Sequence, residues 1–300
     1  MAQTPLVSVV TAAYNMDRYV REAVDSVLAQ DWPALEVIVV DDGSTDDTPR
    51  VLEAYAGNPR GTVVRQANGG QTKAKNAGLR AARGELVGFC DADNAWLPGK
   101  LRRQVPALLA APGAGVVYGD IALIDGEGRP LPKPTTKRWG GRITGRLLAD
   151  NFVTFNTTLV PRRVLAEFGG FDESLRMAID YDLWLRISTK YEFLYLPETC
   201  VNYRIWGGQM SHRTGERLES YFRLLERFLA RYPDSVRASD VARAYAHTWV
   251  TRGMWRATQG DRAGAWRDFG RALRRRPLDV RLWRTAAAVA LGRIGPRGGA

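Results

Sequence analysis

Short apolar runs alternate with amphipathic segments from residue 6 to residue 118. The runs have the length and the β-branched composition of strands, and they cover residues 6–12, 35–40, 62–64, 85–89 and 116–118. Between them, helical spacing of apolar side chains or a helix-starting residue predicts helices over residues 17–30, 48–55 and 69–83. Strands that alternate with helices in this way predict right-handed crossovers and an α/β fold, with a mostly parallel sheet flanked by helices.

Three polar segments follow strands of this predicted sheet. They cover residues 11–15, 41–44 and 91–94. In an open parallel sheet, ligands bind outside the carboxyl ends of the strands. We therefore expect the three segments to meet at one edge of the sheet and to line a binding site there.

From residue 214 onward the pattern is mainly helical. Apolar side chains recur at helical spacing or follow turn residues over residues 219–232, 241–258, 262–275 and 279–291, which predicts four helices. In the third helix the predicted buried stripe comprises Ala265, Trp266, Phe269, Ala272 and Leu273. We therefore divide the chain into an α/β domain, residues 1–213, and a helical C-terminal region, residues 214–300.

The composition, with 45% hydrophobic and 25% charged residues among 300, is that of an ordinary globular protein. Its two cysteines, Cys90 and Cys200, are too few for a disulfide framework, so we expect reduced thiols in a reducing compartment. The N-terminus lacks the basic segment of a signal peptide, and no apolar run approaches the roughly 20 residues that span a bilayer. These features predict a cytoplasmic protein.

The net charge of +11 is concentrated in the C-terminal region. Residues 1–213 hold 25 Lys and Arg against 24 Asp and Glu, whereas residues 214–300 hold 18 Arg against 8 acidic residues. Such a field favours anionic partners, and nucleic acid is not expected because no nucleic-acid motif accompanies the arginines. A peripheral contact with an anionic membrane surface through Arg267, Arg271, Arg274 and Arg275 is one interpretation. A helical cap or a dimer interface is the other.

Asp91 and Asp93 carry the clearest candidate chemistry. They follow the apolar run Leu86–Phe89, one residue apart. Carboxylates beside a buried strand are costly unless a positive group meets them, and a divalent metal that carries the phosphates of a substrate is such a group. A lone Asp-x-Asp is more often a capped loop, so the interpretation depends on the rest of the chain.

Five segments together resemble the family 2 glycosyltransferases, in the order and spacing of that family over residues 5–212. They are Val7–Asn15, Val39–Asp46, Gly69–Gly78, Phe89–Asp93 and Gly169–Arg186. The resemblance implies a GT-A fold, a nucleotide-diphosphate sugar as donor with a UDP-sugar favoured, and Mg²⁺ or Mn²⁺. It also implies inversion at the anomeric carbon, with a saccharide or lipid-linked acceptor in cell-surface polysaccharide synthesis.

The resemblance assigns the nucleotide pocket to residues of the first three segments. Thr11, Ala13 and Tyr14 would line the pocket, and Thr11 stands where the family commonly has proline. Asp42 would accept a hydrogen bond from the base; the alternative is that Asp42 only starts the Asp-Gly turn. Lys75 would lie near the nucleotide or its phosphates.

The metal is assigned by the same resemblance to the fourth segment. Asp93 would bind the metal, and Asp91 would contact the ribose or the metal. Asn94 stands where a third aspartate is frequent, which would alter a contact around the metal ligands.

The general base is assigned to Asp180 in the fifth segment. Ile179 replaces the glutamate that often precedes this base, and Asp182 is the alternative. Asp180 could also act as the N-cap of a helix over residues 181–189, a position that aspartate fills well.

Two other functions are compatible with this fold. A sugar-nucleotide nucleotidyltransferase would carry a glycine-rich loop ending in lysine after the first strand, where this chain has Thr11–Asn15. A non-enzymatic scaffold would bind partners through the helical tail, and the intact Asp42, Asp91, Asp93 and Asp180 argue against it. Donor-dependent release of a nucleotide diphosphate distinguishes the three functions.

Overall fold

The computed structural model describes residues 4–132, 136–209 and 213–291. Internal contacts divide the chain into two compact units. The first comprises Met1–Ile143 and Phe152–Gly207, and the second comprises Thr144–Asn151 and Gly208–Ala300. The predicted domain boundary after residue 213 lies a little beyond this division and stays a prediction.

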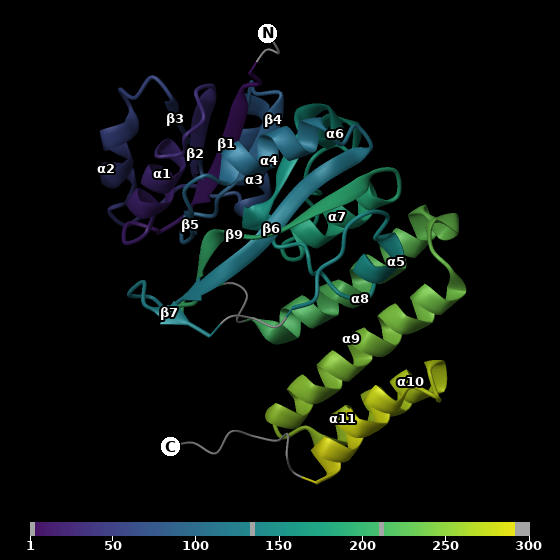
Figure 1. The fold of residues 1–300 in the computed structure, drawn as a ribbon. Helices are drawn as coiled ribbons and strands as arrows, with labels where there is room; N and C mark the ends of the chain where they lie inside the picture. The colour runs from purple at the N-terminus through teal and green to yellow at the C-terminus, as the bar shows by residue number, and fades with distance from the viewer. Residues whose placement is uncertain (1–3, 133–135, 210–212, 292–300) are drawn as a thin grey trace. The chain divides into compact units, whose positions relative to one another are not determined.

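Among the described residues, the first unit contains a nine-stranded mixed sheet (Figure 1). The strand order is β3-β2-β1-β4-β8-β6-β9-β5, and β7 pairs with β6. The strands are β1 Val7–Ala13, β2 Leu35–Asp41, β3 Gly61–Arg65, β4 Leu86–Phe89, β5 Ala95–Trp96, β6 Ala114–Ile124, β7 Pro130–Leu131, β8 Leu159–Pro161 and β9 Glu192–Arg204. The predicted α/β fold is confirmed, and the five predicted strands correspond to β1, β2, β3, β4 and β6.

The four strands β3, β2, β1 and β4 are parallel, and their register aligns their carboxyl ends. Ala13 of β1 lies beside Asp41 of β2, which in turn lies beside Arg65 of β3. Val10 of β1 lies beside Phe89, the last residue of β4. The polar segments that follow β1, β2 and β4 therefore leave the sheet at the same edge, as the sequence predicts.

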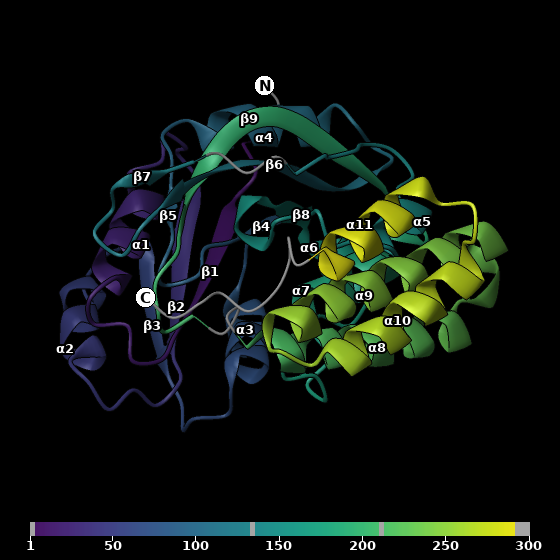
Figure 2. The same cartoon turned by 90° about the horizontal axis from the view of Figure 1, so that it is seen from below.

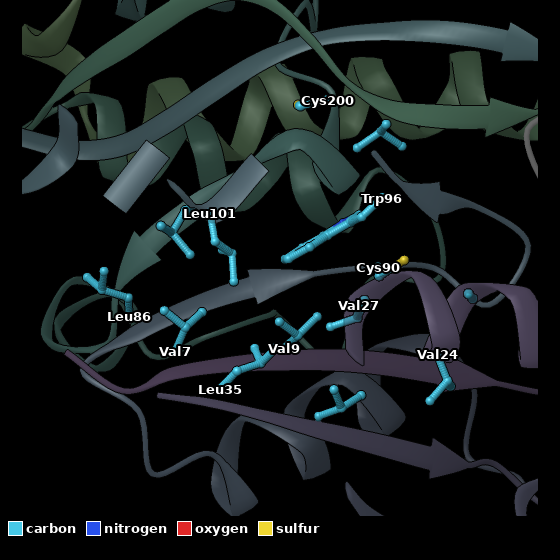
Figure 3. Close-up of a cluster of buried hydrophobic side chains, with 14 of the residues drawn as sticks. Val7, Val9, Val24, Val27, Leu35, Leu86, Cys90, Trp96, Leu101 and Cys200 are labelled. Atoms are coloured by element: carbon cyan, nitrogen blue, oxygen red, sulfur yellow. The ribbon is translucent and has the colours of Figure 1, made fainter. Parts of the chain in front are cut away.

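Helices flank the sheet of the first unit. They are α1 Val20–Leu28, α2 Thr48–Leu52, α3 Gln71–Ala81, α4 Lys100–Leu109, α6 Arg162–Glu167 and α7 Ile179–Ser188. Val7 and Val9 face one way, into a buried cluster with α1 and α4 residues such as Val27 and Leu101 (Figure 3). Val10 faces the other way, against Gly78 of α3, where a Cβ would lie 2.3 Å from Val10 Cγ1. Only glycine at position 78 allows α3 to approach β1 this closely.

The remaining strands pair mostly in the antiparallel sense. β8 is antiparallel to β4 and β6, and β5 is antiparallel to β9, while the two long strands β6 and β9 run parallel and side by side (Figures 1 and 2). The register of β6 and β9 shifts between Tyr118 and Asp120, opposite the part of β9 that contains Pro197. A bulge of this kind accommodates a proline that cannot donate to the ladder.

The second unit is helical, as predicted. It comprises α5 Thr144–Leu147, α8 Thr214–Arg231, α9 Ala238–Thr258, α10 Arg262–Arg275 and α11 Val280–Ala290. Its core includes Val250, Phe269 and Val289, from three different helices. The prediction that Trp266 is buried is wrong: 45% of this residue is exposed, because its ring lies edge-on to Phe269 at the rim of the core. Within the described residues, no helix is both long and apolar enough to cross a membrane.

Candidate active site

Asp42 holds together two loops at the carboxyl edge of the sheet. Its buried carboxylate accepts hydrogen bonds from Gln66 Nε2 at 2.7 Å, from the Gly69 amide at 2.9 Å and from the Gly70 amide at 2.8 Å. Three donors leave room for about one more on a carboxylate, which has roughly four lone-pair positions. Asp42 is therefore fixed in place while one acceptor position stays available for a ligand.

The turn after β2 belongs to Asp41 rather than to Asp42. The Ser44 amide donates to Asp41 Oδ1 at 3.1 Å. Gly43 has φ +73°, and a Cβ there would lie 2.7 Å from the amide nitrogen of Asn68. The interpretation of Asp42 as a mere turn former is thus wrong, because Asp41 makes that bond and Asp42 reaches the loop at residues 66–70.

The loops after β1 and β2 are joined by short polar contacts. The Asp42 amide donates to the Ala13 carbonyl at 2.9 Å, and the Thr45 amide donates to Asn15 Oδ1 at 2.8 Å. Tyr14 lies between these contacts and is 45% exposed, whereas Thr11 and Ala13 are buried. Thr11 Oγ1 has no hydrogen-bond partner among the described residues. This edge therefore offers one accessible aromatic ring on a rigid backbone.

Asp91, which follows β4, forms an ion pair with Lys75 of α3. Lys75 Nζ lies 2.9 Å from Asp91 Oδ1, and Asn156 Nδ2 donates to Asp91 Oδ2 at 2.8 Å. The Lys75 side chain is 8% exposed and its ammonium lies 4.2 Å from the centre of the Phe155 ring. The ammonium thus balances the Asp91 charge, while the ring and Asn156 fix the positions of both.

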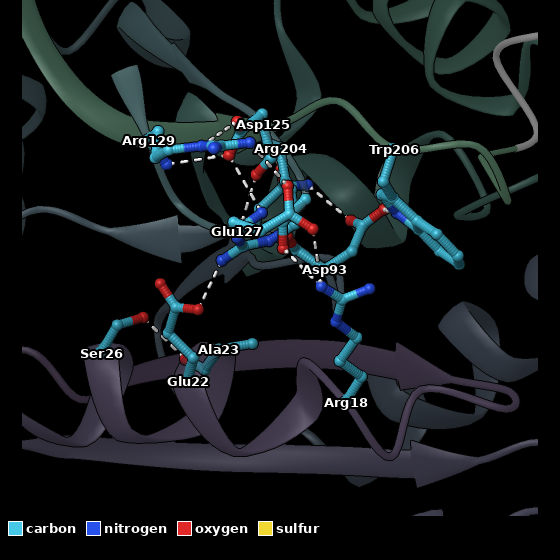
Figure 4. A network of polar contacts seen from close by, with 12 residues as sticks. Arg18, Glu22, Ala23, Ser26, Asp93, Asp125, Glu127, Arg129, Arg204 and Trp206 are labelled. Carbon is cyan, nitrogen blue, oxygen red and sulfur yellow. Dashed lines mark hydrogen bonds and ion pairs between the residues drawn. The ribbon is translucent and has the colours of Figure 1, made fainter. Parts of the chain in front are cut away.

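Asp93 accepts hydrogen bonds from two neutral side chains. Trp206 Nε1 donates to Asp93 Oδ2 at 2.9 Å, and Asn94 Nδ2 donates to Oδ1 at 2.9 Å (Figure 4). The Arg204 guanidinium contacts the Asp93 backbone, since its Nε donates to the carbonyl oxygen at 3.0 Å. These contacts fix the orientation of the carboxylate.

Arg204 is a structural residue in this network. It is buried, it is ion-paired with Glu22, and its guanidinium lies 4.7 Å from the centre of the Tyr19 ring. Its backbone amide donates to Asn94 Oδ1 at 2.8 Å, which connects the end of β9 to the loop after β4 (Figure 4).

The donor set suits a hard divalent cation that also binds a diphosphate. Within the described residues, no three His, Cys, Asp or Glu side chains are grouped to hold a metal ion. Mg²⁺ and Mn²⁺ in phosphate sites need only one or two protein carboxylates, because phosphate and water supply the other oxygens. Asp93, which is oriented by Trp206 and Asn94, meets that requirement, and Asp91 adds a second carboxylate close in sequence.

Helix α3 connects this donor side to the segment that leads into α7. Lys75 on α3 pairs with Asp91, and the next residue, Asn76, contacts the segment that leads into α7. Asn76 Nδ2 donates to the Phe171 carbonyl at 2.9 Å, and Asn76 Oδ1 accepts from the Phe171 amide at 3.0 Å. Thr72 Oγ1 donates to the Leu175 carbonyl at 2.8 Å. One helix therefore positions both the Asp91 ion pair and the approach to Asp180.

Asp180 and Asp182 have different surroundings in the first turn of α7. The helix begins at Ile179, and its N-cap is Ala178, which has φ +58°. The N-cap interpretation of Asp180 is therefore wrong; Asp180 is the second residue of the helix. Asp182 Oδ2 is ion-paired with Arg186 Nε at 2.8 Å, and Arg186 Nη2 donates to the Gly170 carbonyl at 2.8 Å. Asp182 thus belongs to a nearly buried structural pair.

The residues that complete the site come from distant parts of the chain. Asn156, Trp206 and Glu22 lie 65, 113 and 182 residues from their partners Asp91, Asp93 and Arg204. In sequence alone, Arg204 and residues 207–213 resemble the C-terminal loop that closes over the diphosphate in family 2 glycosyltransferases, and no local pattern indicates the contacts of Asn156 or Glu22. Residues 210–212 lie outside the described residues.

The family comparison covers the residues just described. A family model described as "Glycosyl transferase family 2" matches residues 8–166. An uncharacterized glycosyltransferase of Rickettsia prowazekii is 31% identical over 231 residues, which cover 75% of this chain and 72% of that protein. Chondroitin synthase of Escherichia coli is 31% identical over 237 residues, which cover 77% of this chain but 34% of that larger protein.

Solved structures share the fold at lower identity. Staphylococcus aureus TarS 1–349 in complex with UDP-GlcNAc matches with a TM-score of 0.68 and 20% identity, over 90% of this chain and 81% of that chain. The mannosyltransferase PcManGT of Pyrobaculum calidifontis, in complex with GDP-Man and Mn²⁺, matches with a TM-score of 0.64 and 24% identity, over 97% of this chain and 81% of that chain.

Proposed function

This chain belongs to glycosyl transferase family 2 and has the GT-A fold, and we propose that it transfers a sugar from a nucleotide-diphosphate donor to a hydroxyl acceptor with inversion. The observation that carries the proposal is the arrangement around α3. Lys75 of this helix pairs with Asp91, and Thr72 and Asn76 of the same helix bind the backbone that leads to Asp180. Such an arrangement can hold a donor phosphate and an acceptor base at fixed positions.

The leaving group sets the demands on the donor side. When the anomeric C–O bond breaks, negative charge grows on the nucleotide diphosphate. A bound Mg²⁺ or Mn²⁺ would neutralise part of that charge. Asp93 is the residue to hold it, because its carboxylate is oriented by Trp206 and Asn94. Asp91, whose charge Lys75 balances, is left to contact the ribose or to assist at the metal.

The nucleotide would lie across the ends of β1 and β2. Asp42 offers its remaining acceptor position to a base N–H, and the N3–H of uracil is such a donor. Tyr14 offers an exposed ring that can stack on a base. Thr11 and Ala13 support the pocket from the buried strand beneath it.

The acceptor hydroxyl needs a base, because it is a poor nucleophile in its protonated form. Asp180 fills this role in our proposal. The helix N-terminus favours its ionised form, and Asp182 is committed to Arg186. Attack on the anomeric carbon from the face opposite the leaving phosphate, in a single displacement, inverts the configuration.

The names of related proteins narrow the substrates that we propose. TarS is in complex with UDP-GlcNAc, and a chondroitin synthase is among the relatives. We therefore infer a UDP-sugar donor and a glycan or lipid-linked saccharide acceptor in polysaccharide synthesis.

The test is a screen of UDP-, GDP- and dTDP-sugars for release of the nucleotide diphosphate in the presence of Mn²⁺ or Mg²⁺. We expect release from at least one UDP-sugar, and a product whose anomeric proton shows the inverted configuration by NMR. The Asp180→Asn variant is the matched control for nonspecific hydrolysis. Release of pyrophosphate would identify a nucleotidyltransferase instead, and no turnover with any donor and acceptor would favour the scaffold.

A further inference from the structure

Helix α11 exposes an apolar face that its packing in the C-terminal unit leaves uncovered. One side of the helix packs into the core of that unit through Ala286, Val289 and the partly buried Leu282. The opposite side and the turn before it carry large apolar side chains that are mostly exposed. This α11 apolar patch comprises Leu278, Val280, Trp283 and Leu291, with exposed fractions of 92%, 61%, 55% and 68%.

The spacing of the patch is that of one helical face. Val280, Trp283 and Leu291 recur at intervals of three and eight residues, which places them along one stripe of an α-helix. A helix with apolar side chains on opposite faces is expected to be covered on both, and one exposed patch of this kind marks an interaction site.

The polar N–H of Trp283 already has a hydrogen-bond partner within the protein. Its indole Nε1 donates to the carbonyl oxygen of Pro277 at 2.8 Å. A buried tryptophan usually needs a partner for this N–H. Because Pro277 lies in the turn just before α11, the Trp283 ring can be buried without leaving its N–H unpaired.

The surroundings of the patch are strongly basic. Residues 262–291 contain eight arginines and two aspartates. Asp268 is fully buried in an ion pair with Arg252, and Asp279 is ion-paired with Arg276. Arg274, Arg281 and Arg284 are exposed and form no ion pair with any residue that the structure describes. The acidic charges of this segment are therefore compensated, and these three arginines are available to a partner.

We propose that the α11 apolar patch, together with Arg274, Arg281 and Arg284, docks on an anionic lipid bilayer. A bilayer presents anionic headgroups directly above an apolar layer, which matches apolar side chains flanked by arginines. Tryptophan is favoured at that boundary. RNA would meet the arginines but offers nothing that requires the leucines, and a second copy of this face would bring like charges together. This proposal does not depend on the proposed catalytic function.

The structure also changes which arginines we expect to matter. Of the four named from the sequence, Arg271 lies 3.6 Å from Asp268, and the Arg275 guanidinium stacks 5.4 Å from the centre of the Tyr245 ring. Arg267 and Arg274 are exposed and form no ion pair with any described residue. We keep Arg274, which is nearer in sequence to the α11 apolar patch, and add Arg281 and Arg284 of α11.

The experiment is co-sedimentation of the full chain with vesicles of equimolar phosphatidylglycerol and phosphatidylcholine, and with vesicles of phosphatidylcholine alone. We expect binding to the anionic vesicles that weakens with added salt. Each arginine near such a surface is worth roughly five-fold in affinity, so the Arg274→Gln, Arg281→Gln, Arg284→Gln triple variant should bind roughly 100-fold more weakly. A control triple variant, Arg21→Gln, Arg80→Gln and Arg163→Gln, changes the net charge equally in the other unit and should bind like the wild type.

The apolar part of the proposal has its own variants. Leu278→Ser with Trp283→Ser should weaken vesicle binding by at least about ten-fold. Because this variant loses the hydrogen bond from Trp283 to Pro277, circular dichroism should confirm that its helices are intact. Trp283→Phe should still bind, but it should lose part of the fluorescence quenching by brominated lipid that the wild type shows.

Four outcomes would overturn the proposal. The first is no binding to anionic vesicles at low salt. The second is equal loss of binding in the control triple variant, which would make the effect one of net charge alone. The third is vesicle binding that the serine variant leaves unchanged, which would make the binding purely electrostatic. The fourth is a dimer that the serine variant converts to a monomer without any vesicle binding, which would assign the patch to a second copy.

Discussion

Asp180 and Asp182 both lie in the first turn of α7, and the general base that we propose is Asp180. Asp182 is 15% exposed and is paired with Arg186, which also holds the Gly170 carbonyl. We predict that Asp180→Asn lowers turnover by about 10²–10⁴-fold with donor affinity unchanged, as expected for loss of a general base. Steady-state kinetics together with donor binding by calorimetry measure the two effects separately.

Asp182→Asn is the matched comparison. Loss of the Asp182 charge leaves the nearly buried Arg186 unpaired, so we expect a lower melting temperature and a smaller change in turnover. If Asp182→Asn abolishes turnover at full stability while Asp180→Asn is mild, the base is Asp182.

The buried Lys100 leads to a separate prediction about how the free energy of unfolding depends on pH. It is fully buried, its Nζ donates to the Thr157 carbonyl at 3.2 Å, and its ammonium lies 4.1 Å from the centre of the Trp96 ring. Burial lowers its pKa from 10.5 to about 8. Between these values the unfolded chain binds more protons than the folded one, so the contribution of Lys100 to the free energy of unfolding rises with pH.

Lys100→Met tests this sign, because methionine fills a similar volume without a charge. From pH 7 to pH 9 we expect the wild type to gain about 1 kcal/mol relative to the variant. Urea unfolding of both proteins at the two pH values measures the difference, in which the other titrating groups largely cancel. A difference that stays constant or shrinks with pH would mean that Lys100 remains charged in the fold.

At the scale of elements, α3 is the part that connects donor and acceptor sides. Asn76 makes three hydrogen bonds to the segment before α7, two with the Phe171 backbone and one with Glu173. We predict that Asn76→Ala lowers the free energy of unfolding by about 1–3 kcal/mol and lowers turnover more than donor affinity, because the Asp180 segment loses its anchor.

The control for this variant is Asn58→Ala. Asn58 accepts a hydrogen bond from the Arg60 amide in a turn outside α3. It should leave turnover unchanged. An Asn76→Ala enzyme with full turnover would argue that α3 does not position the base.

The parallel half of the sheet could be predicted from sequence because its strands are continuous β-branched runs. β2 is buried at every position, which is the pattern of a strand covered on both faces. β9 and α4 could not be predicted from sequence. Pro197 and polar residues interrupt the apolar run of β9, and Pro106 lies inside α4. These elements form because tertiary pairing outweighs local preference.

The same division applies to the site. The carboxylates Asp42, Asp91 and Asp93 were found from local motifs at strand ends. The side chains that bind these carboxylates could not be predicted. Trp206, for example, lies 113 residues from Asp93, and no local pattern predicts such a contact. Register and long-range folding alone bring these partners together.

At the scale of the whole molecule, the second unit contains a buried ionic cluster of its own. Arg252 pairs with Asp268 through two bonds of 2.8 and 2.9 Å, and Arg256 lies 3.1 Å from the same carboxylate. We predict that Asp268→Ala lowers the free energy of unfolding of this unit by about 3–5 kcal/mol, because Arg252, Arg256 and Arg271 lose the buried carboxylate that they share.

Thermal unfolding of the Asp268→Ala variant by circular dichroism measures that loss, with the exposed Asp234→Ala as the control. Donor hydrolysis at low temperature should persist, since every residue of the proposed catalytic site lies in the first unit. A variant as stable as the wild type would show that the cluster contributes little.

Sugar transfer requires, in our proposal, a metal that Asp93 holds against the donor diphosphate. The test is the rate of nucleotide-diphosphate release by the wild type and by Asp93→Ala, each with Mn²⁺ and with excess chelator. We predict release by the wild type only with metal, and none by the variant, whose circular dichroism spectrum should match that of the wild type. Full release by Asp93→Ala, or by the wild type in excess chelator, would show that transfer needs no metal at Asp93.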